Sequence, residues 1–353
     1  MGLFPKDRDL TQPPREVELP VRASDWQERP AELKVRLDAF LARFLRWRSR
    51  ASLQSLIHEG YVLVAAAAPE RPGATLPAEV ERRPGRRLLH GSMVTVRIPE
   101  SLQADPPPTT SAELEVLWED AFLVAVDKPP DVPVHPSGRH LTDTLIQRVH
   151  ARYQGQQSGP EAILKLCHRL DKETSGAILV ARERGVHAAV MSAFEQRLVE
   201  KEYLAIVHGV PERDEGEIDL PLGSSRTSRI SLKMAVRADG LPSRTSWRVV
   251  ERARDCALLA IRLHTGRQHQ IRVHMEAIGH PLVGDKLYGV EDEIFLANSR
   301  GELSEEQLEA LGLPRQALHN HRLALRHPRT REWLEIVSPL ARDMSEYLAQ
   351  RAL

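Results

Sequence analysis

Hydrophobic residues in the first hundred positions recur with the spacing of two helices and two strands. One segment is apolar at i, i+3, i+4, i+7 and i+8, which predicts a helix with one buried face: Leu37, Phe40, Leu41, Phe44 and Leu45. A second helix is predicted over 53–57, and strands are predicted over 61–64 and 93–97, each shortly after a glycine. Residues 1–33 are rich in proline and charge without any such period, so we expect a flexible tail there.

The rest of the chain contains several apolar runs of strand length and one clear helical pattern. A polar, proline-rich linker over 101–113 precedes them. Strands are predicted at 114–118, 122–126, 162–166, 177–181, 201–209 and 258–263. One buried helix face is predicted by the spacing of Val186, Ala189, Val190, Phe194 and Leu198. We therefore divide the chain into a module over 34–100 and a second domain over 114–353.

Charge is balanced over the whole chain but not within it. The 353 residues contain 49 Lys or Arg and 49 Asp or Glu, so there is no net field that attracts nucleic acid. Residues 34–97 hold twelve Lys or Arg against five Asp or Glu, which indicates a local basic surface or simply a solvated helix face. An acidic insertion covers 290–316. We expect a short helix within 305–313. The acidic insertion should face away from a bound polyanion or mark the limit of the surface that binds it.

Cysteine usage and hydropathy exclude several classes of protein. Cys167 and Cys256 lack the spacing of a disulfide framework or a zinc ribbon, and reduced thiols fit an intracellular protein. No apolar run reaches the ~18 residues that a membrane span needs, and the first residues form no hydrophobic leader. We therefore expect a cytoplasmic monomer that does not associate with membranes.

A polar turn over 167–176 separates two predicted strands and carries a candidate catalytic carboxylate, Asp171. A capping aspartate in a surface turn is the ordinary interpretation of such a residue. However, His168-Arg169-Leu170-Asp171 followed by Thr174-Ser175-Gly176 resembles the signature of the RluA-type RNA pseudouridine synthases. The resemblance implies that Asp171 is the catalytic aspartate.

Other stretches of the second domain carry the same resemblance. Residues 127–136 are similar to the family's first motif, with Asp127 and Asp131 in place of its usual Asn and Gly. Lys201-Glu202-Tyr203 matches a Lys-x-Tyr motif, and 265–274 matches Thr-Gly-Arg-x-His-Gln-Ile-Arg-x-His. The stretch His319-Asn320-His321-Arg322-Leu323 differs by one residue from the family's His-Ala-His-Arg-Leu.

The first domain resembles a second known module. The order of Arg36-Leu37-Asp38, Ser49-Arg50 and the strand near 61–64 is similar to the S4 domain, a small RNA-binding module that many of these synthases carry. The family's usual Asn-Gly after the strand is replaced by alanines at 65–68. The resemblance implies RNA contacts by Arg36, Arg48 and Arg50, and it favours structured ribosomal RNA over transfer RNA as the partner.

The resemblance implies a fold and a set of site residues. The fold is α+β, a pseudouridine synthase catalytic domain around a mixed, largely antiparallel sheet, preceded by the small S4-like α/β module. Asp171, Tyr203 and Arg272 form the implied catalytic set, in which Arg272 holds Asp171 by two parallel hydrogen bonds. Tyr203 stacks on the flipped base, and Arg169 fills the gap that the base leaves. Substrate contacts are also implied for His168, Thr174, Lys201, His269, Gln270 and Ile271, and His168 is expected to brace the turn.

The implied reaction requires neither a cofactor nor a metal. Conversion of uridine to pseudouridine breaks the N1–C1′ bond, turns the uracil and joins C5 to C1′, without redox change. Because charge at the sugar resembles an oxocarbenium ion, a carboxylate suits the task, either as a nucleophile at C1′ or as a base. The histidines at 264, 269 and 274 give no zinc pattern. A Cys167–His168 nucleophile pair is disfavoured, because adjacent residues point apart. Two alternatives remain, namely RNA binding without catalysis and a synthase that acts on transfer RNA.

Overall fold

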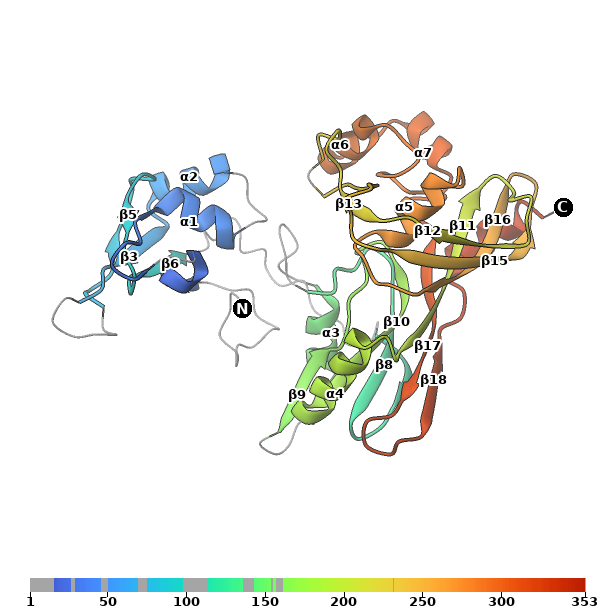
Figure 1. Cartoon of the computed structure of the whole chain (residues 1–353), viewed down its shortest axis with the longest axis horizontal. Coiled ribbons are helices and arrows are strands. Elements are labelled where there is room, and N and C mark those ends of the chain that lie inside the picture. The colour runs from blue at the N-terminus through green and yellow to red at the C-terminus, as the bar shows by residue number, and fades with distance from the viewer. Residues whose placement is uncertain are drawn as a thin grey trace. The chain divides into compact units, whose positions relative to one another are not determined.

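The computed structural model describes residues 16–26, 29–45, 50–68, 75–97, 114–135, 143–153, 155–156, 161–230 and 232–352. These residues form two compact units (Figure 1). The first contains the described residues before position 112 and those of 135–151. The second contains those of 112–134 and of 152–353.

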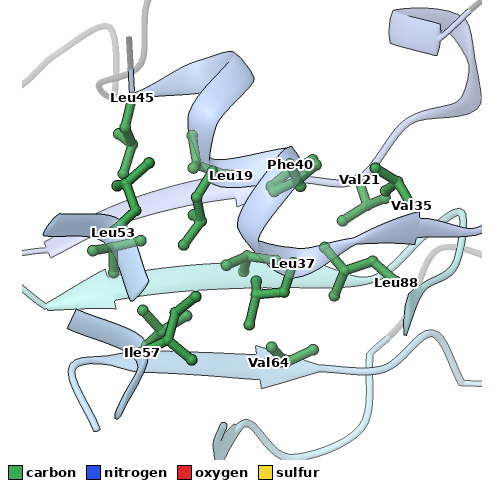
Figure 2. Packing of buried hydrophobic residues seen from close by; sticks show 14 of the residues in the cluster. Leu19, Val21, Val35, Leu37, Phe40, Leu45, Leu53, Ile57, Val64 and Leu88 are labelled. Carbon is green, nitrogen blue, oxygen red and sulfur yellow. The ribbon is translucent and has the colours of Figure 1, made fainter. Parts of the chain in front are cut away.

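The first unit is a small sheet with two helices packed on one face (Figure 2). Its four strands have the order β1-β6-β3-β4 and are antiparallel. Apolar residues of the helices and strands meet in one core, including Leu19, Phe40, Leu53, Ile57 and Val64. The elements are β1 (Glu16–Pro20), the 3-10 helix η1 (Ala23–Trp26), β2 (Val35–Arg36), α1 (Leu37–Phe44), α2 (Arg50–Glu59), β3 (Val62–Ala65), β4 (Glu79–Val80), β5 (Arg87–Leu88), β6 (Met93–Arg97) and α3 (Leu145–Arg152), the last of which belongs to this unit through residue 151.

The helices and strands predicted for this unit are confirmed, but the expectation of an unstructured tail is wrong for part of its length. Residues 16–20 form β1, which pairs with β6 and points Val17 and Leu19 into the core. The alternation of charged and apolar residues there is only five residues long. Its partner strand lies more than seventy residues later in the sequence, so the local pattern gave little sign of the pairing.

The second unit is built on one sheet of ten strands. Eight of them have the order β12-β15-β16-β11-β17-β10-β8-β7, while β18 pairs with β17 and β9 pairs with β10. Among the described strands the pairing is antiparallel except between β10 and β17, so the predicted mixed, largely antiparallel sheet is confirmed. The strands of the sheet are β7 (Glu115–Glu119), β8 (Leu123–Lys128), β9 (Ala162–Leu166), β10 (Ser175–Glu183), β11 (Glu200–His208), β12 (Glu215–Asp219), β15 (Arg244–Arg252), β16 (Cys256–Leu263), β17 (Leu318–Arg326) and β18 (Trp333–Val337).

Helices cover this sheet in two places. One apolar cluster lies where α4 (Arg184–Glu195) packs on β9 and β10, and another lies under α8 (Arg342–Ala349). The predicted buried face of the first helix is confirmed for Val186 and Val190 but is wrong for Ala189, which is exposed, and for Leu198, which is 61% exposed. The helix ends three residues before Leu198, and Arg197 takes a left-handed backbone conformation that turns the chain away.

The remaining elements lie around the end of the sheet near α5 (Gln270–Ala277) (Figure 1). The acidic insertion forms α6 (Asp292–Arg300) and α7 (Glu305–Leu311), which confirms the predicted short helix. Ser304 and Gln307 form a capping box at the start of α7. Strands β13 (Leu222–Ser224) and β14 (Met234–Val236) form a separate ribbon. Within the described residues, no helix has the length and apolar character required to cross a membrane.

Candidate active site

Asp171 lies in the turn between β9 and β10, at the point where β10 meets β17. The close approach of these two strands requires a glycine at position 176, which has a φ of +109°. A Cβ atom at this position would lie 2.4 Å from the backbone oxygen of Asn320. Gly176 pairs with Asn320 in the parallel register of the two strands. The turn is thereby held against the middle of the sheet.

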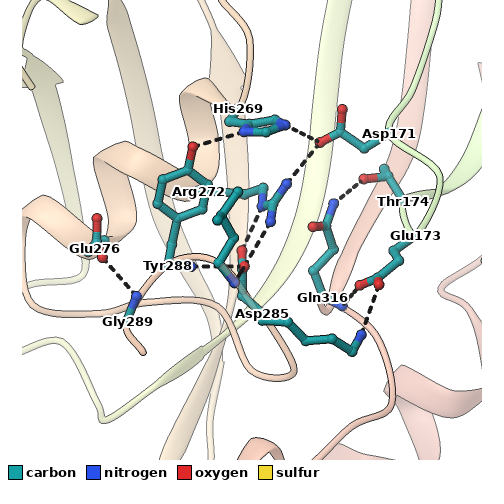
Figure 3. A network of polar contacts seen from close by, with 12 residues as sticks. Asp171, Glu173, Thr174, His269, Arg272, Glu276, Asp285, Tyr288, Gly289 and Gln316 are labelled. Carbon is teal, nitrogen blue, oxygen red and sulfur yellow. Dashed lines mark hydrogen bonds and ion pairs between the residues drawn. The ribbon is translucent and has the colours of Figure 1, made fainter. Parts of the chain in front are cut away.

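The residues that follow Asp171 fasten the turn to the rest of the unit (Figure 3). Glu173 accepts hydrogen bonds from Lys286 Nζ at 2.8 Å and from the backbone N–H of Gln316 at 3.1 Å. Thr174 Oγ1 accepts a hydrogen bond from Gln316 Nε2 at 2.7 Å. Buried Lys128 donates to the backbone oxygen of Lys172 at 2.8 Å. The hydroxyl of Thr174 is therefore hydrogen-bonded within the protein, whereas the sequence analysis implied that Thr174 contacts substrate.

Arg272, near the start of α5, reaches two carboxylates. Its Nε and Nη2 donate to Asp285 at 2.6 and 2.8 Å, and its Nη1 donates to Asp171 Oδ2 at 3.4 Å. The expectation that Arg272 holds Asp171 by two parallel bonds is therefore wrong, because the fork is formed with Asp285. Burial alone would lower the pKa of Arg272, but neighbouring Asp285 raises it above its ordinary value.

Asp285 is a buried partner of Arg272 that the sequence analysis did not single out. It is 2% exposed and also accepts hydrogen bonds from the backbone N–H groups of Leu287 and Tyr288 at 2.9 and 3.1 Å. Its position in the stretch Gly284-Asp285-Lys286-Leu287-Tyr288-Gly289 was the available signal. A buried aspartate with this many donors fixes the orientation of Arg272.

His269 approaches the same oxygen of the Asp171 carboxylate as Arg272 does (Figure 3). Its Nε2 is 3.9 Å from Asp171 Oδ2, and its Nδ1 is 2.8 Å from the hydroxyl of Tyr288. Burial, and after it the charge of Arg272, lower the pKa of His269 to about 4. The imidazole is therefore neutral near pH 7.

Asp171, Tyr203 and Arg272 line one cavity of about 550 Å³, a size within the range of roughly 300–1,000 Å³ that is usual for small-molecule sites. Tyr203 lies on β11 with its ring buried. Burial, and after it the charge of Asp171, raise the pKa of the Tyr203 phenol well above its ordinary value, so the hydroxyl keeps its proton. Sequence-predicted residues that also line the cavity are His168, Arg169, Thr174, Lys201, His269, Gln270 and Ile271.

Two of these lining residues are engaged mainly in holding the local structure. The His168 ring accepts a hydrogen bond from the Leu179 N–H at 3.1 Å and lies 4.9 Å from the ring of Phe194, as expected for a residue that braces the turn. The Gln270 amide donates to Arg244 O and Thr245 Oγ1 and accepts from Thr265 Oγ1. The amide of Gln270 therefore orders the loop before α5.

The geometry gives no support to cysteine or zinc chemistry. Burial raises the pKa of the Cys167 thiol to about 12 and lowers the pKa of His168 to about 3, so this pair holds neither a thiolate nor a charged imidazole near neutral pH. His264 is hydrogen-bonded to Ser246, and His274 lies between Thr245 and the carbonyl of Leu220. No group of three potential metal ligands occurs among the described residues.

The arginines predicted to bind RNA in the first unit are only partly described. Arg36 is half-exposed and donates through Nε and Nη2 to the buried carboxylate of Asp38, both at 3.0 Å. Asp38 also accepts from the side chain of Gln54 at 3.4 Å, which connects α1 to α2. Arg48 and the side chain of Arg50 lie outside the described residues.

Comparison with known proteins identifies the class of molecule that has this fold and cavity. The sequence profile of the family described as RNA pseudouridylate synthase matches residues 122–277. The chain is 35% identical over 315 residues to the "Uncharacterized RNA pseudouridine synthase YlyB" of Bacillus subtilis, covering 89% of this chain and 93% of that one. The chain thus belongs to the RNA pseudouridine synthase family, whose members are isomerases.

Other similar proteins agree with this assignment. The "Ribosomal large subunit pseudouridine synthase D" of Nitrosomonas europaea is 36% identical over 315 residues, which cover 89% of this chain and 83% of that protein. The solved structure titled "Human RNA Pseudouridylate Synthase Domain Containing 1" has a TM-score of 0.52 and 26% identity, and the match covers 67% of this chain and 86% of that one. The second unit therefore has the pseudouridine synthase fold.

Proposed function

We propose that this protein converts specific uridines of ribosomal RNA to pseudouridine in the cytoplasm, acting as a monomer with Asp171 as its catalytic carboxylate. One observation carries the assignment of Asp171. Among the described residues that line the cavity it is the one carboxylate, and its side chain is 37% exposed. Nearby Glu173 and Asp285 are both occupied by hydrogen bonds within the protein.

The position of Asp171 supports direct action on the ribose. The N1–C1′ bond of the flipped uridine breaks, the uracil turns, C5 joins C1′, and the proton lost from C5 is balanced by one gained at N1. A carboxylate beside C1′ assists either as a nucleophile or as a base that removes a sugar proton. Arg272 donates to the same carboxylate at 3.4 Å and stabilises its charged form through either route.

Two further residues receive roles in this proposal. Tyr203 places a buried aromatic ring in the wall of the cavity, and a flipped base stacks favourably on such a ring. Arg169 lies exposed at the rim, two residues before Asp171. The side chain of Arg169 occupies the space that the uridine leaves. Unstacking a base costs on the order of a few kcal/mol, and the inserted side chain compensates part of this cost.

Ribosomal RNA is proposed because several relatives bear the name of a large-subunit synthase, including those of Nitrosomonas europaea and Neisseria meningitidis. The first unit supports a module for structured RNA. It presents two helices followed by a strand, in a segment with twelve basic and five acidic residues between 34 and 97. We propose that this unit is the S4-like RNA-binding module.

The test uses ribosomal and transfer RNA isolated from a strain that lacks the gene and labelled with tritium at C5 of uridine. The wild-type protein should release tritium from the ribosomal fraction and not from transfer RNA. Asp171→Asn should release none and should bind RNA as well as, or slightly more tightly than, the wild type. Asp219→Asn, which changes an exposed carboxylate on β12, is the matched control and should behave as wild type. Tritium release by Asp171→Asn within tenfold of wild type would contradict the catalytic assignment, and release from transfer RNA alone would contradict the substrate.

A further inference from the structure

A second hollow of about 710 Å³ adjoins the active-site cavity. The two share Phe194, Lys201, Leu263, Gly266 and Arg267, so they form a continuous depression. Arg197, Arg262 and His264 line only the second hollow. Its wall is therefore rich in cationic side chains, while the active-site cavity beside it holds Asp171.

These cations differ in what they bind. Arg262 lies 3.5 Å from Glu200, and Arg322 lies 3.0 Å from the same carboxylate. In the part of the chain that the structure describes, no carboxylate lies within ion-pair distance of Arg197, Lys201 or Arg267. Among the described residues, the side chain of Arg267 donates only one long hydrogen bond, 3.4 Å, to the carbonyl of Pro242. Glu195, the second carboxylate in the wall, is exposed.

Lys201 stands between the two hollows. Its ammonium lies 5.8 Å from the ring of Phe194, and burial and then the charge of Arg197 lower its pKa below the ordinary value. Lys201 and Arg197 carry like charges that repel each other. An anion that binds between them would stabilise both.

The backbone at Arg197 supports the same conclusion. Its φ is +60°, in the left-handed region that disfavours residues with a side chain, and the turn after α4 is closed by hydrogen bonds from Arg197 and Leu198 to Phe194 and Ala193. Glycine or asparagine is the usual residue at this point of a helix end. An arginine kept in a strained conformation at the edge of a binding hollow indicates a functional requirement for its side chain.

We propose that Arg197, Lys201 and Arg267 form a binding site for a backbone phosphate of the RNA strand that flanks the target uridine. This inference rests on the proposed RNA substrate. Guanidinium groups bind phosphate oxygens through two parallel N–H groups, and the lysine adds a compact charge on the side that faces the cavity. The phosphate so held sets the register of the strand and places one nucleotide beside Asp171.

The experiment measures how RNA affinity depends on salt in the full-length protein, with a short oligouridylate as the probe. Each lost phosphate contact on a single strand lowers the slope of log affinity against log salt by ~0.7. Arg197→Gln and Arg267→Gln should each lower the slope by about this amount, and the double variant by about twice as much. Arg262→Gln is the matched control from the same hollow, because its charge is already paired with Glu200, and its slope should equal that of wild type.

All measurements are repeated in an Asp171→Asn background, so that the phosphate site is judged without turnover. Slopes for Arg197→Gln and Arg267→Gln that equal wild type, or an equal loss in Arg262→Gln, would overturn the site. If the wild-type protein releases no tritium while the variants lose slope as expected, the proposed reaction is rejected. The phosphate site is then still supported.

An independent observation concerns Tyr288, which is 1% exposed and lies behind His269 (Figure 3). Its hydroxyl accepts a hydrogen bond from the backbone N–H of Met234 at 2.9 Å and lies 2.8 Å from His269 Nδ1. The hydroxyl proton has no other acceptor among the described residues, and a buried donor is expected to be paired. It is therefore donated to Nδ1, and the ring proton of the neutral imidazole sits on Nε2, the atom nearest Asp171.

We infer that Tyr288 is a positioning residue that keeps the Nε2–H of His269 directed at the Asp171 carboxylate and the reacting sugar. Tyr288→Phe retains the ring, which lies 4.9 Å from the guanidinium of Arg272, and removes only the hydroxyl. The single-turnover rate should fall by up to about 100-fold, because a small misplacement of a positioned group can cost this much, while RNA affinity stays at the wild-type value.

A double-mutant cycle with His269→Gln tests this role. The glutamine amide nitrogen occupies the position of Nε2 and does not depend on Tyr288, so Tyr288→Phe should have no further effect in the His269→Gln background. Nitrogen NMR of the wild type should show the Nε2–H tautomer of His269, and Tyr288→Phe should show a mixture. Additive losses of rate, or an unchanged tautomer in Tyr288→Phe, would overturn the inference and assign the effect to packing.

Discussion

The guanidinium of Arg272 lies against the carboxylate of Asp285, with two hydrogen bonds of 2.6 and 2.8 Å, and reaches Asp171 with its remaining Nη1 at 3.4 Å. Asp285 fixes the plane of the guanidinium, and this plane determines where the free N–H points. The contact with Asp171 is therefore determined by a residue that does not line the active-site cavity.

Replacement of Arg272 by lysine should damage both activity and stability. Lysine keeps the charge but cannot form the fork with Asp285 and also reach Asp171. We expect the single-turnover rate to fall at least a hundredfold, on the order of 3 kcal/mol. The melting temperature should also fall, because Asp285 keeps a buried charge with a weaker partner. Asp285→Asn, compared in the same assays, should lose less rate because Nη1 remains near Asp171. A rate for Arg272→Lys equal to wild type at saturating RNA would contradict this account.

Glu173→Gln tests what anchors the turn that contains Asp171. The substitution leaves Lys286, which is nearly buried, without its carboxylate at 2.8 Å. Loss of one partner of a buried pair costs about 3–5 kcal/mol, and partial exposure of Glu173 reduces this to about 1–3 kcal/mol. Thermal and urea denaturation measure the loss. The further change Lys286→Met should recover part of it, and no recovery in the double variant would show that the ion pair is not the cause.

Asp127 should make the stability of the protein depend on pH. Burial raises the pKa of this carboxyl from 3.8 to about 6, and its Oδ1 has no hydrogen-bond partner. The native state therefore binds the proton more tightly than the unfolded chain does, and stability decreases as pH rises from about 4 to about 6. Asp127→Asn removes this loss. It should be more stable than wild type by about 1–3 kcal/mol above pH 6, with no gain below pH 4.

Urea denaturation of Asp127→Asn and wild type at several pH values provides the measurement. Asp120→Asn is not a suitable control, because Asp120 accepts two backbone hydrogen bonds in the preceding turn. The exposed Asp219 is suitable. A difference between variant and wild type that does not change with pH would contradict the assignment to titration of Asp127.

Neutralisation of basic residues in the first unit should separate binding from structure. Arg48→Gln together with Arg50→Gln is predicted to lower the salt slope of RNA affinity by about 1.4–1.8, for two lost phosphate contacts. Arg36→Gln should act differently, because Arg36 is bonded to buried Asp38, and its main effect should be a lower melting temperature of the first unit. Equal slopes for all three proteins would remove the RNA-binding interpretation of these arginines.

The sequence predicted the main elements because most of them have strong local patterns. The helix that contains Phe40 and Leu41 and the strands around 162–166 and 177–181 follow from spacing alone. The convergence of Asp171, Tyr203 and Arg272 on one cavity was not available from spacing. It came from resemblance, since these three residues lie on elements that meet only in the folded sheet.

The interaction partners of residues and strands were harder to predict than the positions of the elements along the sequence. The fork of Arg272 goes to Asp285, thirteen residues later, because the chain turns back immediately after α5. Likewise β1 pairs with β6 across the whole first unit, and no local signal reports such a pairing. A pattern in the sequence states which face of an element is apolar, but the identity of the neighbouring carboxylate depends on the tertiary path.

The parallel pairing of β10 with β17 has a consequence for how the protein is made. Strand β17 lies between β11 and β10 in the sheet, yet it comes from residues 318–326, far beyond the end of β10 at Glu183. During vectorial synthesis on a ribosome, Asp171 emerges long before Asn320, the residue against which Gly176 must close. The first unit has its main strands and helices complete by residue 97 and is able to fold early. The pairing that holds the Asp171 turn therefore forms only after β17 has been synthesised, and we expect a nascent chain that stops before β17 to lack it.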